Sequence, residues 1–355
     1  MINYVDLKAF KSFPNKRIDF RKLTLFSGIN NSGKSSIIQA MRMFYQAADG
    51  ESPLLQGHGT VNEMRSKFSS PTEVIQIEFG FTDGCHSILK IDGSIVEKPS
   101  RVPVHSYIGA DRLGPKTSLP LLRALVDYPR VGDQGEFVLD YLQHLGDCIL
   151  PDALVHEKAQ GKTLEYVLAG WLNEISPGVE FSFKLNNKAD IAHAEIDSYR
   201  PTNVGFGLSY TLPVITAILG MAVGSPLGGW TQSWGARWEE LKTTNGAVVI
   251  IENPEAHLHP QGQTAMGRLI ALAAGCGVQM VVETHSDHLM DGIRIAVKEM
   301  KIDAEDVAFH YLTKNSKGIS EVATPKLDQN GKLEFWPDGF FDQTLKNRAQ
   351  LARKS

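Results

Sequence analysis

The residues whose types and spacing best suit chemistry form a glycine-rich stretch at positions 28–35. It reads Gly-Ile-Asn-Asn-Ser-Gly-Lys-Ser and fits the phosphate-binding template G-x-x-x-x-G-K-[S/T] without a mismatch. Its glycines let backbone amides curl around phosphate groups, while Lys34 reaches the β- and γ-phosphates and the Ser35 hydroxyl ligates Mg²⁺. The stretch therefore predicts a nucleotide site formed by Asn30, Asn31, Ser32, Gly33, Lys34, Ser35 and Ser36.

The flanking segments have the patterns needed to position this loop. Residues 23–26, Leu-Thr-Leu-Phe, predict a short buried strand that runs into it. After the loop, apolar residues recur at helical spacing, namely Ile37, Ile38, Met41, Phe44 and Tyr45. A helix that begins directly after the loop adds the partial positive charge of its N-terminus to the phosphate site.

Polar residues follow two further apolar runs in the second half of the chain. The run at 247–251 ends in Glu252-Asn253-Pro254-Glu255, and the run at 280–282 ends in Glu283-Thr284-His285-Ser286. Open α/β sheets bind ligands at the carboxyl ends of their strands. We therefore expect Glu252 to hold Mg²⁺ opposite Ser35, and His285 to touch the γ-phosphate. A single histidine at a strand end is usually structural, but two polar strand ends downstream of a phosphate loop favour a site.

The composition is that of an ordinary soluble globular protein. The chain has 355 residues, of which 42% are hydrophobic and 21% charged, so it predicts one large domain with an insertion, or two lobes. A net charge of −4 excludes a global field that would attract nucleic acid or an anionic membrane. Cys85, Cys148 and Cys276 are too far apart in sequence to suggest a disulfide framework, and the first residues do not resemble a signal peptide. We expect a reduced, cytoplasmic protein.

Two patterns leave alternatives open. Residues 204–224 lie in an uncharged stretch and are mostly apolar, yet they contain Pro213 and lack flanking basic clusters, which favours a buried helix over a membrane span. Basic residues concentrate in residues 1–26, where they either protect solvated strand edges or contact nucleotide phosphate or nucleic acid. They are Lys8, Lys11, Lys16, Arg17, Arg21 and Lys22.

The remaining elements follow from periodicity. Alternation predicts strands near residues 2–5, 18–20, 73–79, 87–91 and 104–108, and a hairpin over 179–199. A long loop is expected at 49–72, and helical spacing from Leu121 to Ile175 predicts a helical lobe over residues 116–176. Three histidines, His257, His259 and His285, with His288 beyond, do not match a zinc template, so we expect no metal other than Mg²⁺.

The combination of motifs resembles the ABC-type ATPases of the SMC, RecF and OLD group. The resemblance covers about residues 1–312: the glycine loop, the helical lobe, the strand that ends Glu-x-Pro-Glu-x-x-Leu-His-Pro and the strand that ends Glu-Thr-His-Ser. It implies an α/β P-loop NTPase fold, an ABC-type ATPase head with a mainly helical insertion, and ATP with Mg²⁺ as ligands. It also implies a homodimer in which two heads sandwich two ATP molecules.

Residues 203–209 lie where this family keeps its signature motif, which contacts the ATP of the other subunit. The resemblance assigns Gly205, Gly207 and Ser209 to that contact. Two glycines that open a helix make an anion site. The usual Leu-Ser-Gly-Gly sequence is absent, so an ordinary glycine turn is the alternative.

Four segments are expected from the motifs. They are an N-terminal lobe with the phosphate loop at 1–115, a helical lobe and hairpin at 116–200, a C-terminal lobe at 201–312 and a C-terminal module at 313–355. Residues 334–342, Glu-Phe-Trp-Pro-Asp-Gly-Phe-Phe-Asp, resemble the end of a bacterial branch of OLD-like ATPases that often occurs in defence settings. Neither coiled-coil arms nor an acidic nuclease (Toprim) segment is recognisable.

The resemblance suggests an ATP-driven switch that dimerises and controls a partner protein. The expected partner is an effector or nuclease encoded nearby, and the expected process is antiphage defence. No association with a membrane is expected. A RecF-like repair protein that binds DNA directly and a nucleotide-gated scaffold with little hydrolysis are the alternatives.

In the family, the strand before the Pro usually ends Asp-Glu, of which the first acid serves Mg²⁺ and the second the attacking water. Here Glu252 can serve the metal, but Asn253 is not a base, and Glu255 is the nearest carboxylate that can replace it. We therefore expect slow hydrolysis.

Overall fold

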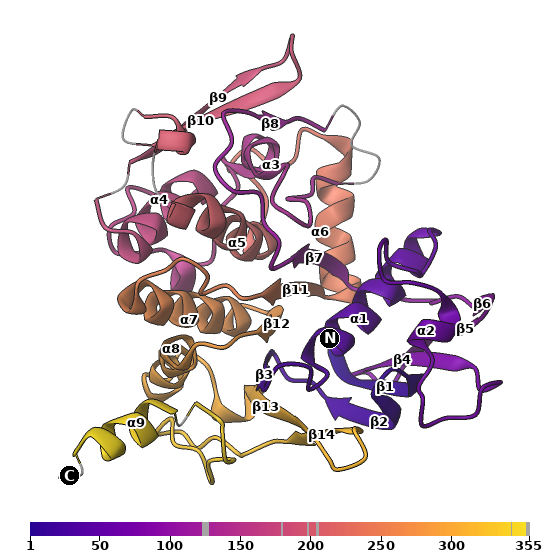
Figure 1. Cartoon of the computed structure of the whole chain (residues 1–355). Coiled ribbons are helices and arrows are strands. Elements are labelled where there is room, and N and C mark those ends of the chain that lie inside the picture. The colour runs from indigo at the N-terminus through magenta and orange to yellow at the C-terminus, as the bar shows by residue number, and fades with distance from the viewer. Residues whose placement is uncertain (123–127, 179, 197–198, 204–205, 342, 353–355) are drawn as a thin grey trace. The chain divides into compact units, whose positions relative to one another are not determined.

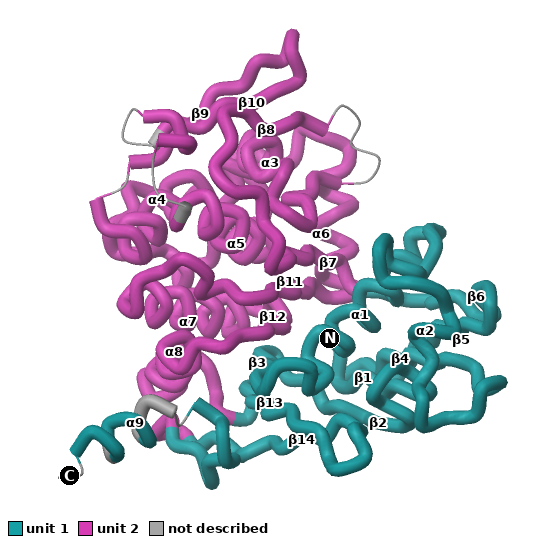
Figure 2. The backbone as a smooth tube through the Cα atoms, viewed as in Figure 1, with its two compact units in different colours: residues 1–102, 305–328, 332–355 teal, residues 103–304, 329–331 magenta. Residues whose placement is uncertain are grey.

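A computed structural model describes residues 1–122, 128–178, 180–196, 199–203, 206–341 and 343–352. These residues divide into two compact units, shown in Figure 2. Unit 1 contains residues 1–102, 305–328 and 332–355, and unit 2 contains residues 103–304 and 329–331. Unit 2 is therefore inserted, in sequence, between the two main parts of unit 1. The division into four segments by motif stays a prediction.

Unit 1 contains an antiparallel sheet whose strands are ordered β2-β1-β4-β5-β6. Alternate residues of β1, such as Val5 and Leu7, are fully buried, so one face of this strand belongs to the core. A short helix, α2 (Val61–Met64), lies in the predicted loop at 49–72. The strands are β1 (Ile2–Phe10), β2 (Phe13–Asp19), β4 (Ile75–Phe81), β5 (His86–Asp92) and β6 (Ser94–Glu97).

A second group of strands in unit 1 carries the phosphate loop. Its order is β14-β13-β3, in which β3 (Leu23–Gly28) runs parallel to β13 (Val307–Lys314), and β13 pairs antiparallel with β14 (Ser320–Ala323). Helix α1 (Lys34–Asp49) follows the loop and packs Phe44 on Phe79 of β4, with ring centroids 3.8 Å apart. Helix α9 (Gln343–Ala352) ends the described chain.

Unit 2 contains parallel strands in the order β12-β11-β7. They are β7 (Val104–Ile108), β11 (Ala247–Glu252) and β12 (Val278–Glu283). All six residues of β12 and the first five of β11 are buried, as expected of parallel strands covered on both faces. Three helices lie next to these strands in the chain (Figure 1). Helix α6 (Ser233–Asn245) precedes β11, α7 (Pro260–Gly275) connects β11 to β12, and α8 (Asp287–Lys298) follows β12.

The helical lobe also belongs to unit 2. Helices α3 (Val138–Leu145), α4 (Leu164–Ile175) and α5 (Phe206–Ala222) pack against one another (Figure 1). Beside them, β8 (Leu119–Pro120), β10 (Ile191–Ile196) and β9 (Phe181–Asn186) form an antiparallel sheet in that order. Short 3-10 helices occupy Asp152–Leu154, Pro201–Asn203 and Ala304–Asp306.

The structure confirms the predicted strands, the hairpin and the buried helix, α5, which accommodates Pro213. None of the described helices is long and apolar enough to cross a membrane. The helical spacing predicted from Leu121 onward is not observed at Leu121 and Leu122, which follow strand β8, and Leu125 lies outside the described residues. The periodicity was misleading there because Leu119–Pro120 pairs with β10 instead.

Candidate functional site: a phosphate loop and an acidic loop

The phosphate loop in unit 1 depends on two glycines for which no other residue would fit. Gly28, the last residue of β3, has φ of 147°, and a Cβ atom added there would lie 2.2 Å from the Leu312 carbonyl oxygen of β13. Gly33, the N-cap of α1, has φ of 112°, and a Cβ atom there would lie 2.5 Å from Ser320 Oγ. Both distances are shorter than van der Waals contact, so the neighbouring strands require glycine at these positions.

Lys34 folds back over the loop that precedes it. Its side chain is buried, and Nζ donates hydrogen bonds to the carbonyl oxygens of Gly28, at 2.9 Å, and Ile29, at 3.1 Å. The ammonium group is therefore held at the centre of the loop, where it is a point charge for phosphate.

The remaining predicted contacts of the loop differ in their exposure. Asn30, Asn31 and Ser35 are exposed, and Ser36 is half-buried. Ser32 is buried, and its carbonyl oxygen accepts a hydrogen bond from Ser320 Oγ at 2.6 Å. Helix α1, which the structure describes in full, has no acidic residue in its first turn, so the positive end of its dipole remains available to an anion.

The acidic loop in unit 2 follows β11 and contains Glu252, Asn253 and Glu255. Tyr107 of the neighbouring strand β7 donates a hydrogen bond to Glu252 Oε1 at 2.5 Å. The half-buried Glu252 carboxylate is thereby oriented through one oxygen, and it remains a suitable hard ligand for Mg²⁺. Ser35 of unit 1 is an exposed residue, and a serine hydroxyl is chemically suitable as a Mg²⁺ ligand as well.

Asn253 adopts the left-handed conformation, with φ of 46°, which asparagine tolerates better than most residues. Its amide donates to the Glu283 carbonyl oxygen at 2.8 Å, and its own carbonyl oxygen accepts from Arg112 Nη2 at 2.5 Å. Its side-chain Oδ1 is buried and has no hydrogen-bond partner among the described residues. The backbone of Asn253 is thus fixed on both sides, while its side-chain oxygen is left without a partner.

Glu255 joins the ends of two adjacent strands. Its Oε1 accepts a hydrogen bond from the backbone amide of His285, at 2.9 Å, which follows β12. Its Oε2 is buried without a hydrogen-bond partner among the described residues. The His285 side chain itself is exposed. The structure therefore brings Glu252, Asn253, Glu255 and His285 together in unit 2.

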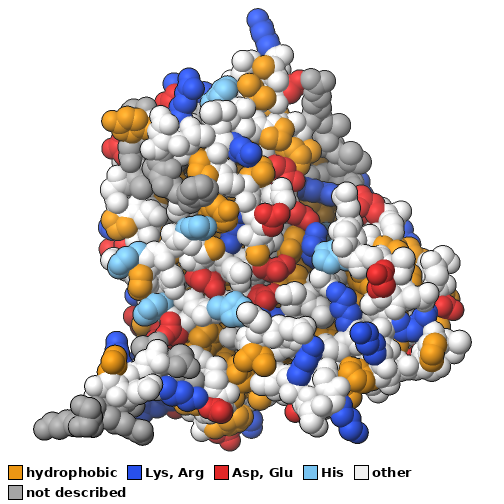
Figure 3. All heavy atoms as spheres, viewed as in Figure 1, with side chains coloured by type: hydrophobic (Ala, Val, Ile, Leu, Met, Phe, Trp, Pro, Cys, Tyr) orange, Lys and Arg blue, Asp and Glu red, His pale blue; other side chains and the backbone are white. Residues whose placement is uncertain are grey.

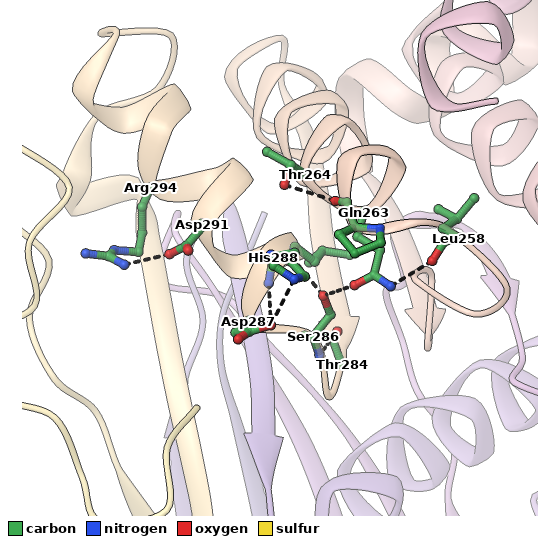
Figure 4. A network of polar contacts seen from close by, with 11 residues as sticks. Leu258, Gln263, Thr264, Thr284, Ser286, Asp287, His288, Asp291 and Arg294 are labelled. Carbon is green, nitrogen blue, oxygen red and sulfur yellow. Dashed lines mark hydrogen bonds and ion pairs between the residues drawn. The ribbon is translucent and has the colours of Figure 1, made fainter. Parts of the chain in front are cut away.

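A network of hydrogen bonds centred on helix α7 joins the segments that follow β11 and β12 (Figure 4). Gln263 of α7 accepts a hydrogen bond from Ser286 Oγ at 2.5 Å and donates one to the Leu258 carbonyl oxygen at 2.9 Å. Ser286 Oγ also accepts from the Leu289 amide and so caps helix α8. The segment after β11 and the segment after β12 are thereby tied to one helix.

The predicted signature residues lie at the start of α5 in the same unit. A Cβ atom added to Gly207 would lie 3.3 Å from the His257 carbonyl oxygen, and the rings of Tyr210 and His257 are 4.4 Å apart. Ser209 is half-buried in the same helical turn. The start of α5 is thus packed against the end of the acidic loop. Gly205 lies outside the described residues.

Sequence reasoning gave no role to Tyr107 and Arg112, which contact the acidic loop directly. Arg112 is 3% exposed, and its guanidinium carbon lies 5.7 Å from the centroid of the Tyr210 ring. Burial lowers the pKa of Arg112, and the nearby Glu255 carboxylate opposes this shift most strongly. The available signal was their place at the end of β7, since carboxyl ends of parallel strands meet at one edge.

Groups of three or more His, Cys, Asp or Glu residues arranged to hold a metal ion do not occur among the described residues. His257, His259 and His288 therefore belong to no such group. Ser35 and Glu252 as ligands of Mg²⁺ remain a prediction.

Figure 3 shows Lys and Arg side chains gathered on the visible face over the β1–β2 region. Part of this basic group has a structural role. Lys22 pairs with Asp306 at 2.7 Å, Arg17 with Asp6 at 3.7 Å, and Lys11 donates to Gln39. Contact with nucleic acid through the remaining residues stays a prediction.

Two family models match the chain. The model described as "AAA ATPase domain" matches residues 1–200 and 173–290, and the model described as "Protein of unknown function (DUF3696)" matches residues 302–351. No curated protein matches the sequence.

Solved structures are similar at low sequence identity. An SMC head domain from Pyrococcus furiosus, bound to the C-terminal domain of ScpA, is 13% identical with a TM-score of 0.50, covering 99% of each chain. An SMC head domain from Thermotoga maritima is 15% identical with a TM-score of 0.44, covering 92% of this chain and 99% of its own. The recombination mediator RecF is 12% identical with a TM-score of 0.42, and the match covers 91% of this chain and 98% of the RecF chain. The first of these supports an SMC-head fold.

Proposed function

Because the chain belongs to the AAA ATPase domain family, we propose that this ABC-type ATPase is an ATP-dependent switch. ATP binds at the phosphate loop, two copies associate around it, and the closed state acts on a partner protein. The observation that carries the proposal is the loop itself. Lys34 is buried against the Gly28 and Ile29 carbonyl oxygens, beside the N-terminus of α1, whose first turn contains no acid that would compete with a phosphate.

For hydrolysis, we assign separate roles to the acidic residues. Glu252 serves the Mg²⁺ that accompanies ATP, together with Ser35, and His285 contacts the γ-phosphate. Asn253 orients the attacking water through its side chain, as positioning residues do in other phosphoryl-transfer sites. Glu255 accepts the proton, and its buried, unpaired Oε2 supports this assignment. Turnover is slow because asparagine occupies the usual position of the base.

For association, Gly207 and Ser209 of one copy contact the ATP bound by the other. The support is a glycine in the first turn of α5, a helix of Phe206–Ala222, because the N-terminus of a helix favours anions. Gly207→Glu adds bulk and negative charge beside phosphate and should abolish association. Ser209→Glu is a second variant, because a longer side chain at Gly207 also approaches the His257 carbonyl oxygen.

The test is the mass in solution with and without a non-hydrolysable ATP analogue. We expect the wild type to double its mass with the analogue and both glutamate variants to remain monomers that still bind nucleotide. Tyr166→Glu, at an exposed position on α4, is the matched control and should associate as the wild type does. Unchanged association of Gly207→Glu and Ser209→Glu would remove the proposed interface.

We propose further that the partner is an effector or nuclease encoded nearby and that the pair acts in antiphage defence in the cytoplasm. Exposed Phe335 and Trp336, in the C-terminal segment matched by the second family model, are candidates for its contact. Co-purification of the neighbouring gene's product with the wild type, but not with Phe335→Ala/Trp336→Ala, is the test. Binding to DNA with a steep salt dependence would instead favour the RecF-like alternative.

A second candidate function is a nucleotide-gated scaffold that hardly hydrolyses ATP. The observation that favours it is Asn253, whose amide cannot accept a proton near neutral pH. ATP-dependent association without measurable single-turnover hydrolysis would support the scaffold.

A further inference from the structure

Arg112 is a buried cation at the edge of the acidic loop. It follows β7, which pairs in parallel with β11 so that Ile108 lies opposite Ile251. The carboxyl ends of the two strands therefore meet, and Arg112 Nη2 donates to the Asn253 carbonyl oxygen at 2.5 Å. With 3% of its surface exposed, the side chain is shielded from solvent.

Arg112 and the acidic loop together contain buried donors and acceptors that have no partner among the described residues. The donors are Nε and Nη1 of Arg112, and the acceptors are Glu255 Oε2 and Asn253 Oδ1. Burying a charged donor without a partner costs free energy, so each such group calls for an explanation, of which a catalytic role is one. Their occurrence together indicates that the groups serve one another in another state.

Electrostatics identifies Glu255 as the partner that suits Arg112. Among the groups that oppose the burial-induced lowering of the Arg112 pKa, Glu255 acts most strongly, ahead of Tyr210, Glu252 and Tyr107. Glu255 Oε1 is already held by the His285 amide, so Oε2 is the oxygen that remains for a guanidinium. A carboxylate offers about four acceptor positions, so a pair with Arg112 leaves room for a water molecule.

We propose that Arg112 is a positioning residue for ATP hydrolysis, which fixes the left-handed Asn253 through its carbonyl oxygen and pairs with Glu255 when ATP is bound. This inference rests on the proposed function. The hydrogen bond to Asn253 sets the direction in which the chain continues to Glu255, two residues later. The guanidinium then holds the carboxylate against the attacking water, while ATP binding itself does not need Arg112.

A double-mutant cycle in single-turnover hydrolysis tests this coupling, with Arg112→Gln, Glu255→Gln and the double variant. We expect each single variant to be about 10²-fold slower than the wild type, as for loss of a general base. The double variant should be no more than about 3-fold slower than the slower single variant, because both act through one carboxylate. Rate losses that multiply to about 10⁴-fold would overturn the proposal.

Conservative replacement and nucleotide affinity separate positioning from other roles. Arg112→Lys keeps the charge but loses the fork of donors, so we expect a rate about 10-fold below the wild type. If Arg112→Gln fails to fold, Arg112→Lys takes its place in the cycle. Affinities for ATP and ADP should both remain within about 3-fold of the wild type in either variant. A loss confined to ATP would assign Arg112 to the phosphate and overturn the proposal.

Arg268→Gln is the matched control, because Arg268 lies exposed on α7 and pairs with Glu299 at 2.7 Å. It should hydrolyse ATP at the wild-type rate.

Failure of the proposed function gives a different result from failure of the role of Arg112. A wild type that binds no ATP, or never hydrolyses it in a single turnover, contradicts the ATPase mechanism, whereas an active wild type with multiplying effects contradicts only the role of Arg112.

Discussion

The phosphate loop of unit 1 and the acidic loop of unit 2 are built by different means. In the phosphate loop, Lys34 binds the carbonyl oxygens of residues only five and six positions earlier, and one contact from a distant strand, Ser320 Oγ to the Ser32 carbonyl oxygen, is added. In the acidic loop, Glu252 and Asn253 are held by Tyr107 and Arg112, more than 140 positions away in the chain. A site built from local backbone is visible as a short motif, and a site built from distant side chains is not.

The loops also differ in how completely their polar groups are paired. In the phosphate loop, Lys34 is hydrogen-bonded to two carbonyl oxygens, and Ser32 Oγ is a buried atom without a partner among the described residues. At the acidic loop, Glu255, Asn253 and Arg112 all retain such buried atoms. We infer that the phosphate loop is preformed for its ligand and that the acidic loop completes its contacts only during the reaction.

The largest expected effect comes from the preformed loop. Lys34→Ala should weaken ATP binding by about 10³-fold, because it removes charge-assisted contacts worth about 4 kcal/mol in total. Titration with a fluorescent ATP analogue measures this loss, and circular dichroism should show an unchanged fold. Lys90→Ala, on β5 in the same unit and paired with Glu97 at 2.6 Å, is the control and should bind normally. Wild-type affinity of Lys34→Ala would separate the loop from nucleotide binding.

The next largest effect is expected on the rate of ATP hydrolysis, from substitutions in the acidic loop. Glu255→Gln should slow single-turnover hydrolysis by about 10²-fold, or about 2.7 kcal/mol, with little change in ATP affinity. Asn253→Asp should accelerate it, because aspartate tolerates the left-handed conformation and supplies a carboxylate. Fast wild-type turnover that survives Glu255→Gln would require another base and would end the slow-switch interpretation.

The contrast between the loops matches what the sequence could predict. The template at residues 28–35, the strand before it and the helix after it are all observed, because local spacing determines them. The apolar runs at 247–251 and 280–282 correctly indicated strands with polar ends. Tyr107 and Arg112 were missed because only the parallel pairing of β7 with β11 brings them to Glu252 and Asn253. The short strand β8 was missed because it pairs with β10, about 70 residues away.

A smaller effect is expected on the pH dependence of the free energy of unfolding, through histidines on the strands beside each loop. Burial lowers the pKa of His310 on β13 to about 4, and that of His105 on β7 to about 3, from 6.5. Between pH 6.5 and 4 the unfolded chain binds a proton that folded His310 does not, so stability falls as pH falls and the loss is complete below pH 4. For His310 the loss should be about 2 kcal/mol from pH 7 to pH 5.

Urea unfolding at several pH values measures this slope. His310→Gln cannot titrate and should show a shallower dependence than the wild type, with His105 supplying part of the remainder. A slope in His310→Gln as steep as that of the wild type would show that His310 is not the group that titrates.

The smallest effect is expected at the surface of unit 1. The ion pair between Lys22 and Asp306 is 2.7 Å long but partly exposed, so Lys22→Ala should lower the free energy of unfolding by less than about 1 kcal/mol. ATP affinity should not change. A marked fall in ATP affinity would instead connect the basic residues of the N-terminal strands with the nucleotide.

The pairing of Gly28 with Leu312 has a consequence for the newly synthesised chain. A ribosome that adds about 5–20 residues per second needs roughly 15–60 s to proceed from one to the other. During that interval β3 has emerged without β13, so an apolar strand edge next to the future nucleotide loop has no neighbour on that side. Residues 103–304 of unit 2 are made before β13, and premature termination before β13 leaves a chain with a phosphate-loop sequence but without its supporting strand.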